Sequence, residues 1–105
     1  MNNKELFIIK PSKRKDKRYV VVMDQMLHHF GSKNGKNFLD HQDESKRKAY
    51  IARHSVKEDW SIKGQHSSGF WSYHIGWTEP TLLKAVQRLE KKFGFRIAVK
   101  DIDKL

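Results

Sequence analysis

Apolar runs separated by polar turns open the chain. Residues 5–10 (ELFIIK) form a short apolar run that ends at a proline, which predicts a first strand. Residues 19–23 (YVVVM) are apolar at consecutive positions, as is typical of a strand that lies centrally or is covered on both faces. A turn near Asp24 and Gln25 would return the chain through residues 26–31 (MLHHFG) as a third strand. The pattern therefore predicts a three-stranded meander.

A helical pattern follows the turn-forming segment GSKNGK. The helix is predicted within residues 38–55 (FLDHQDESKRKAYIARHS), where Asp43 and Glu44 would place negative charge at the positive end of the helix dipole. Either Asp40 or Asp43 could be the N-cap, because both carry a carboxylate that can accept a backbone N–H bond. Apolar residues are sparse at helical spacing, so this helix is expected to be only weakly amphipathic.

The clearest amphipathic pattern runs from about Glu79 to Phe93. Apolar residues recur there at helical spacing, at Leu82, Leu83, Val86, Leu89 and Phe93. Thr78 is the predicted N-cap and Gly94 the predicted C-terminal stop. Lys84, Arg88, Lys91 and Lys92 fall largely outside the apolar stripe. Residues 95–100 (FRIAVK) then predict a last strand.

Between the two helical patterns, residues 56–80 are rich in aromatics and glycines without a regular period. We expect irregular structure with a short helical turn there, and we expect its large rings to belong mainly to the core. The whole pattern predicts one α+β domain over residues 1–105. Its small antiparallel sheet of three to four strands would pack with two helices and the aromatic-rich irregular segment.

Charge narrows the choice of partner. The 105 residues include 22 Lys and Arg against 12 Asp and Glu, a formal net charge of +10. Such an excess makes the surface potential strongly positive, which favours nucleic acid, an anionic membrane or an acidic protein face as partner. No window reaches the ~20 apolar residues of a membrane span, and the first residues lack the pattern of a signal peptide. A protein that is not secreted is expected.

Cysteine is absent, which removes disulfides, thiolate catalysis and cysteine-based zinc sites. A metal would need histidine and carboxylate ligands alone. His41 and His54 would lie at opposite ends of the predicted helix, about 15 to 18 Å apart at ~1.5 Å per residue, too far to share one ion. We therefore expect no metal and no cofactor.

A series of short motifs lies within about residues 30–83. They are Phe30-Gly31, Asp40-His41-Gln42-Asp43, Tyr50-Ile51-Ala52-Arg53-His54, Glu58-Asp59-Trp60, Gly69-Phe70-Trp71-Ser72 and Trp77-Thr78-Glu79-Pro80. The series resembles the pattern FG, D-x-H-x-D, Y-I-x-R-H, E-x-W, G-F-W-S and W-x-x-P of a small uncharacterised family found in large double-stranded DNA viruses and related phages, except that Asp40 directly adjoins His41. The resemblance implies a domain of unknown function in a viral setting, associated with the virion or the genome, in the host cytoplasm or nucleus.

Two sets of candidate site residues follow. Basic residues of the first loop and the first helix are candidates for binding nucleic acid, with DNA as the expected partner: Lys13, Arg14, Lys15, Lys17, Arg18, Lys46, Arg47 and Arg53. Polar and aromatic residues of the motifs are candidates for a structural cluster that ties the first helix to the aromatic segment: Asp40, His41, Asp43, Tyr50, His54, Trp60, Trp71 and Trp77.

The expected function is electrostatic binding of nucleic acid without strong sequence specificity and without catalysis, since no helix-turn-helix, zinc-finger or RNA-recognition signature is visible. The alternative is a minor capsid or virion component whose basic faces meet acidic patches of a shell protein. A metal-dependent nuclease using Asp40, His41, Asp43 and Glu58 is less favoured, because acidic residues at helix starts are common structural caps and no catalytic spacing is present.

Overall fold

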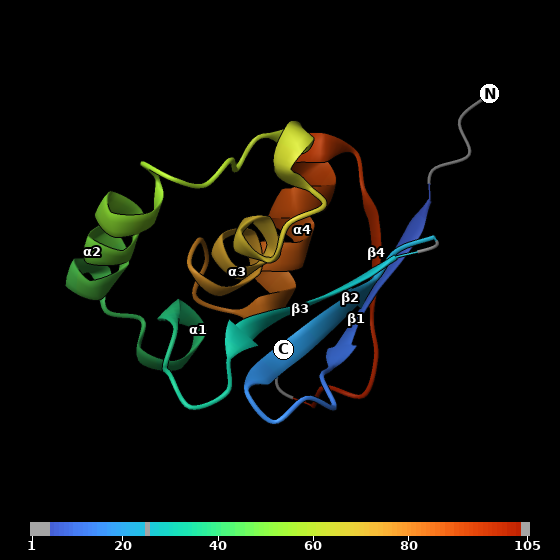
Figure 1. The fold of residues 1–105 in the computed structure, drawn as a ribbon, viewed down its shortest axis with the longest axis horizontal. Helices are drawn as coiled ribbons and strands as arrows, with labels where there is room; N and C mark the ends of the chain where they lie inside the picture. The colour runs from blue at the N-terminus through green and yellow to red at the C-terminus, as the bar shows by residue number, and fades with distance from the viewer. Residues whose placement is uncertain (1–4, 25, 104–105) are drawn as a thin grey trace.

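The computed structural model describes residues 5–24 and 26–103. Within these residues the fold is a small α+β arrangement, as predicted (Figure 1). Its elements are β1 (Leu6–Pro11), β2 (Lys17–Val22), β3 (Leu27–Ser32), α1 (Phe38–His41), α2 (Glu44–His54), the 3₁₀ turn η1 (Ile62–Gly64), α3 (Ser68–Gly76), α4 (Leu82–Phe93) and β4 (Arg96–Val99).

The four strands form one sheet in the order β3-β2-β1-β4. The predicted meander is confirmed, since β1 pairs with β2 and β2 with β3, both antiparallel. Gln25, which belongs to the predicted turn, lies outside the described residues. The expectation of an antiparallel sheet is wrong at β4, which pairs parallel with β1. The chain reaches β4 through the helices, and a crossover of this kind returns a strand in the parallel direction.

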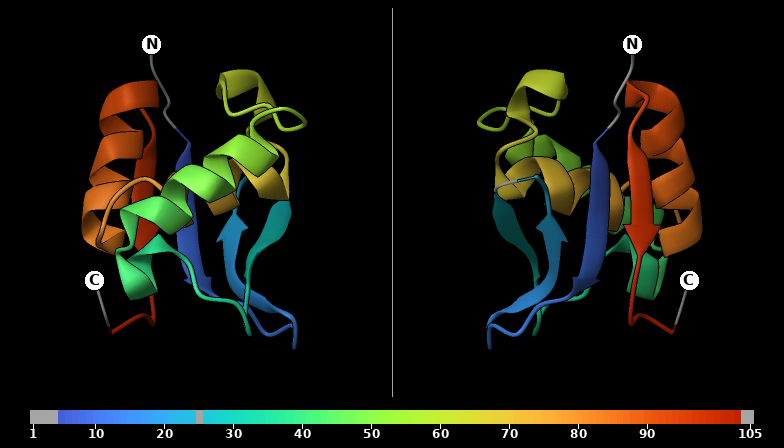
Figure 2. Two further views of the ribbon diagram at one scale, coloured as in Figure 1. Left: turned by 90° about the vertical axis from the view of Figure 1, so that its left-hand side faces the viewer. Right: turned by 90° about the vertical axis from the view of Figure 1, so that its right-hand side faces the viewer.

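Helices α3 and α4 cover one face of the sheet (Figures 1 and 2). Alternate strand residues such as Phe7, Ile9 and Val21 point into this layer and are buried. They meet Trp71 and Leu89, which are fully buried on α3 and α4. The right-hand view of Figure 2 shows all four strands in front of the helices, so the opposite face is not covered by a described helix.

The aromatic segment is more regular than predicted, because it contains the helix α3 and the 3₁₀ turn η1. The Ser67 hydroxyl accepts a hydrogen bond from the Phe70 backbone N–H and caps this helix. Phe70, Trp71 and Ile75 are all fully buried, although they lie on different sides of the helix. A helix that is enclosed on several sides has no polar stripe, so its sequence lacks the alternation by which a surface helix is identified.

The first predicted helix is divided in two. Gln42 adopts a left-handed backbone conformation, with φ of 52°, and ends α1. Asp43 then caps α2, because its carboxylate accepts hydrogen bonds from the backbone N–H groups of Ser45 and Lys46. Of the two predicted N-caps, Asp43 is therefore the one that opens the longer helix.

Helix α4 confirms the predicted apolar stripe but starts three residues later than expected. Its N-cap is Thr81, whose hydroxyl accepts from the Lys84 N–H. The Thr78 hydroxyl instead donates to the His74 carbonyl at the end of α3. Gly94, with φ of 72°, ends the helix as predicted. Leu83, assigned to the stripe from sequence, is exposed.

The outer edge of β3 is capped by hydroxyl groups of α3. Ser68 Oγ donates to the His29 carbonyl at 2.7 Å, and Ser72 Oγ accepts from the Gly31 N–H at 3.1 Å. An edge strand presents such unpaired groups to solvent or to other strands. The two serines, four residues apart on one helix face, satisfy them and fix α3 against the sheet.

Candidate nucleic-acid interface

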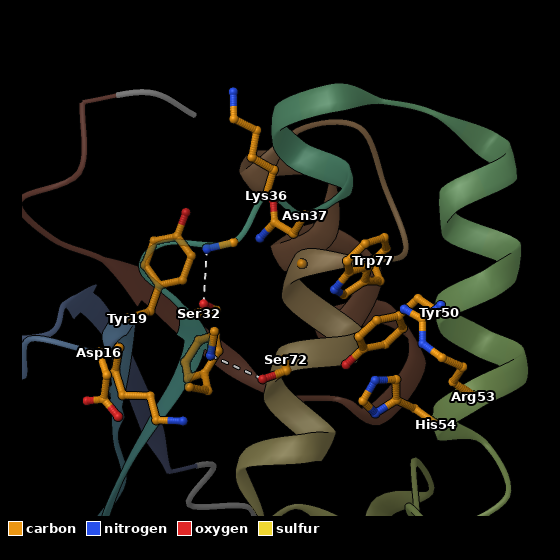
Figure 3. Close-up of a pocket in the computed structure, with 15 residues that line it drawn as sticks. Asp16, Tyr19, Ser32, Lys36, Asn37, Tyr50, Arg53, His54, Ser72 and Trp77 are labelled. Atoms are coloured by element: carbon orange, nitrogen blue, oxygen red, sulfur yellow. Dashed lines mark hydrogen bonds between the residues drawn. The ribbon is translucent and has the colours of Figure 1, made fainter.

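A stack of aromatic rings joins α2 to the end of α3. Tyr50 lies between Trp77 and His54 in Figure 3, with ring centroids 4.2 Å and 4.1 Å away and interplanar angles of 10° and 21°. Trp77 also contacts the His41 ring at 5.4 Å. Parallel rings at this spacing stabilise the contact beyond the area they bury. The stack therefore fixes α2 beside α3.

Glu58, in the loop after α2, links the ring stack to Trp60. Its carboxylate accepts a hydrogen bond from Trp60 Nε1 at 2.9 Å and lies 3.0 Å from His54 Nδ1. Trp60 in turn stacks on Tyr73 of α3 at 3.7 Å. Gly69 permits this approach, because a Cβ there would lie 2.8 Å from the Glu58 carboxyl carbon.

The predicted structural cluster is brought together in part. The stack of aromatic rings contains five of its eight residues: His41, Tyr50, His54, Trp60 and Trp77. The other three, Asp40, Asp43 and Trp71, lie elsewhere. Trp71 belongs to the sheet-facing core and donates its indole N–H to the Gln65 carbonyl. Asp43 is the N-cap of α2.

Asp40 joins α1 to the sheet, not to the aromatic segment as predicted. Its two carboxylate oxygens accept from the Arg18 guanidinium at 2.6 Å and 2.9 Å. This bond holds the pKa of Asp40 below its ordinary value. Arg47 is similarly engaged, because it donates to the Trp77 carbonyl and to Glu44. Two of the eight predicted phosphate-binding residues are thus occupied in holding the fold.

The other basic candidates remain exposed or partly exposed. Lys13, Arg14 and Lys15 lie on the loop between β1 and β2, and Arg14 approaches Asp16 at 3.8 Å. The loop is ordered by backbone bonds, including Ser12 N–H to the Arg18 carbonyl and Lys33 N–H to the Asp16 carbonyl. The second of these places the segment after β3 beside the basic loop.

A pocket of about 540 Å³ opens between this end of the sheet, α2 and α3 (Figure 3). Its lining comes from β2, β3 and the loops beside them on one side and from the two helices on the other: Asp16, Lys17, Tyr19, Phe30, Gly31, Ser32, Gly35, Lys36, Asn37, Tyr50, Arg53, His54, Ser72, Gly76 and Trp77. Gly76 lets α1 approach closely, since a Cβ there would lie 2.9 Å from Asn37 Nδ2.

Positive charge dominates the pocket lining. Lys17, Lys36 and Arg53 contribute cations, and Asp16 is the single carboxylate in the lining. Within residues 5–24 and 26–103, none of these three cations forms an ion pair. Like charges gathered around a hollow repel one another, so the arrangement favours an anion in or above the pocket.

Polar atoms inside the pocket also lack partners in the described part of the chain. The Tyr50 hydroxyl forms no hydrogen bond there, and burial raises the pKa of Tyr50 above its ordinary value, so the hydroxyl keeps its proton. Ser72 Oγ accepts from Gly31 and retains its own proton for donation. Asn37 Oδ1 is buried without a partner.

The rings of the pocket are poorly placed to stack on bases. Tyr50 is covered on both faces by Trp77 and His54, and Tyr19 contacts Phe30 and the Arg18 guanidinium. Trp60 and Tyr73 stack on each other. Base stacking requires an open ring face. The geometry therefore suits the phosphate backbone better than the bases.

The residues considered as metal ligands have other partners in this region. Across the described ranges, no group of three or more His, Asp or Glu side chains could hold an ion. The carboxylates of the nuclease hypothesis are engaged, Asp40 with Arg18, Asp43 at the start of α2 and Glu58 with His54 and Trp60.

No helix in the described residues is both long and apolar enough to pass through a membrane.

Sequence reasoning missed Lys36, Asn37 and Ser72 as pocket residues. They come from a loop and a helix that are far from the basic loop along the chain, and no local pattern links them. Several residues of the short motifs found in the sequence lie together here, since all of the following line the pocket: Phe30, Gly31, Tyr50, Arg53, His54, Ser72 and Trp77.

Comparison with known proteins yields one match. No curated protein and no solved structure is significantly similar to this chain. Residues 7–54, which run from β1 to the end of α2 and include the basic loop, Tyr50 and His54, match the model of a family of unknown function (DUF5754). This part of the chain is thus similar to a domain of unknown function.

Proposed function

We propose that this chain is a small, non-enzymatic protein that binds nucleic acid through phosphate contacts, without strong preference for sequence. The observation that carries the proposal is the gathering of cations at one end of the sheet. Lys13, Arg14 and Lys15 are exposed on a loop that is hydrogen-bonded to the segment after β3, beside the pocket with its own three cations. Cations of this kind bind a polyanion by releasing its condensed counterions.

Weak sequence preference follows from the same geometry. Reading of sequence requires side chains that reach base edges or open ring faces that stack on bases. The pocket rings are packed against protein groups, and the cations lie on exposed positions that suit contacts with a backbone. Phosphate contacts position a protein on nucleic acid but carry no sequence information directly.

The viral resemblance suggests a second partner with the same chemistry, an acidic face of a capsid or virion protein. Both partners offer negative charge, so salt dependence separates them poorly. Free DNA separates them well, because it competes only where nucleic acid occupies the basic surface. The nucleic-acid proposal is preferred because the cations surround a pocket with hydroxyl donors, the groups that bind phosphate oxygens.

The proposal is tested by removing charge from the basic loop. A triple variant with Lys13, Arg14 and Lys15 changed to Gln should bind duplex DNA more weakly, measured by fluorescence anisotropy at several salt concentrations. Each phosphate contact adds about 0.9 to the salt slope, so the slope should fall by roughly two to three if these residues touch phosphate.

A charge-matched control is available on α4. Changing Lys84, Lys91 and Lys92 to Gln removes the same charge from exposed helix positions that do not line the pocket. This control should keep most of the wild-type slope. Equal losses in the two triple variants would mean that net charge alone drives binding, and the assignment of the interface to the loop would be wrong.

A further inference from the structure

The pocket beside the basic loop combines three features that a phosphate group requires. Lys17, Lys36 and Arg53 supply positive charge around it. Tyr50 and Ser72 supply hydroxyl donors, and Figure 3 shows the Tyr50 hydroxyl directed towards Ser72 across the lower part of the pocket. Its volume of about 540 Å³ is within the range of small-molecule sites, about 300 to 1,000 Å³.

From these groups we infer that the pocket binds one phosphate group of a nucleic-acid strand, held by the Tyr50 hydroxyl and the Arg53 guanidinium. This inference rests on the proposed function and makes it more specific. The basic loop would attract a duplex or a single strand alike, whereas a pocket admits a strand end or a splayed-out phosphate.

The donors are held rigidly, which lowers the cost of binding. Tyr50 is fixed between Trp77 and His54, and its hydroxyl forms no hydrogen bond within the described residues that a ligand would have to break. Ser72 is fixed by the hydrogen bond from Gly31. Donors that are already in place lose little conformational freedom when they bind. The cations on the rim are exposed and can adjust to the ligand.

Opposite charge in the pocket does not exclude an anion. Asp16 faces the basic loop, where it lies 3.8 Å from Arg14 and its backbone carbonyl accepts the Lys33 N–H. His54 is held by Glu58, whose carboxylate does not line the pocket, although its charge also acts on Tyr50. The balance of charged side chains in the lining, three cations against one carboxylate, therefore favours phosphate.

The test compares two oligothymidylates of the same length, one with a 5′-phosphate and one with a 5′-hydroxyl, with inorganic phosphate as a third probe. Backbone amide shifts in NMR spectra report where each probe binds. Tyr50→Phe removes the hydroxyl and keeps the ring, so the stack should persist. Arg53→Gln removes the rim charge. Lys91→Gln on α4 is the matched control.

The phosphorylated strand is expected to shift the NMR signals of the Asn37, Tyr50 and Ser72 amides. Tyr50→Phe should weaken the binding of this strand about tenfold, because it removes one hydrogen bond to a charged group. Lys91→Gln should bind as the wild type does. Shifts with inorganic phosphate alone would support a phosphate site but overturn its assignment to a strand. Unmoved pocket amides, with duplex binding still dependent on the basic loop, would overturn the inference and leave the proposed function intact.

Discussion

His74 is a buried neutral imidazole, and its burial makes the stability of the fold depend on pH. Only 1% of the residue is exposed. Its Nε2 lies 2.8 Å from the Trp60 carbonyl, an acceptor, so Nε2 carries the proton. Its Nδ1 lies 3.0 Å from Arg88 Nη1, a donor, so Nδ1 is unprotonated. A second proton at Nδ1 would face the Arg88 guanidinium directly.

Burial lowers the pKa of His74 to about 4, and the Arg88 and Lys92 charges act in the same direction. The unfolded chain takes up the proton near the ordinary value of about 6.5. Between these two values the unfolded state binds one more proton than the folded state. The contribution of the neutral His74 to the free energy of unfolding is therefore fully present above about pH 6.5. It falls as the pH is lowered towards 4.

The free energy of unfolding should fall by about 2 kcal/mol between pH 7 and pH 5, because its slope in the window between the two pKa values is about 1.4 kcal/mol per pH unit. Urea denaturation followed by tryptophan fluorescence measures it directly. His28, whose pKa is also lowered by burial and by His66, adds to the same trend. His74→Gln should therefore flatten the dependence without abolishing it.

NMR titration of the wild-type protein follows the His74 and His28 rings separately. It does not depend on whether a His74 variant folds. The His74 ring should remain neutral down to about pH 5, because its pKa lies near 4. A ring that titrates near pH 6.5, or a His74→Gln variant with unchanged pH dependence, would refute this reasoning.

Two further predictions concern the ring stack and the edge of β3. His54→Ala should lower the melting temperature, because it removes a stacking partner of Tyr50 and a contact of Glu58. The two losses together should lower the free energy of unfolding by about 1 to 2 kcal/mol. An unchanged melting curve with lost DNA binding would mean that His54 is functional, not structural. Ser72→Ala leaves the Gly31 N–H without its partner, so amide exchange at Gly31 should accelerate and stability fall by about 1 to 3 kcal/mol; unaltered exchange would contradict the role given to Ser72.

Elements with a strong local pattern could be predicted from sequence. The meander follows from apolar runs separated by turns, and α4 follows from its apolar stripe and Gly94. Its N-terminus was harder to place, because residues 78–81 (TEPT) offer two threonines with the same capping chemistry. Thr81 caps the helix, since the Thr78 hydroxyl is taken by the His74 carbonyl.

Features set by long-range contacts could not be predicted. The parallel pairing of β4 with β1 depends on where the helices return the chain, and nothing in residues 95–100 records that direction. Helix α3 was missed because it is enclosed on several sides. The pocket combines a loop after β3 with two helices, so the residues proposed to bind phosphate are adjacent only in the folded chain.

We propose that the basic loop and the pocket beside it bind nucleic acid by neutralising phosphates. A salt titration of wild-type binding to duplex DNA tests it most directly. The proposal predicts binding at about 50 mM salt and a linear fall of log K with log salt, with a slope steeper than about −3, as expected if four or more phosphates are contacted. No binding at about 50 to 100 mM salt, where phosphate contacts are strongest, or binding indifferent to salt, would contradict it.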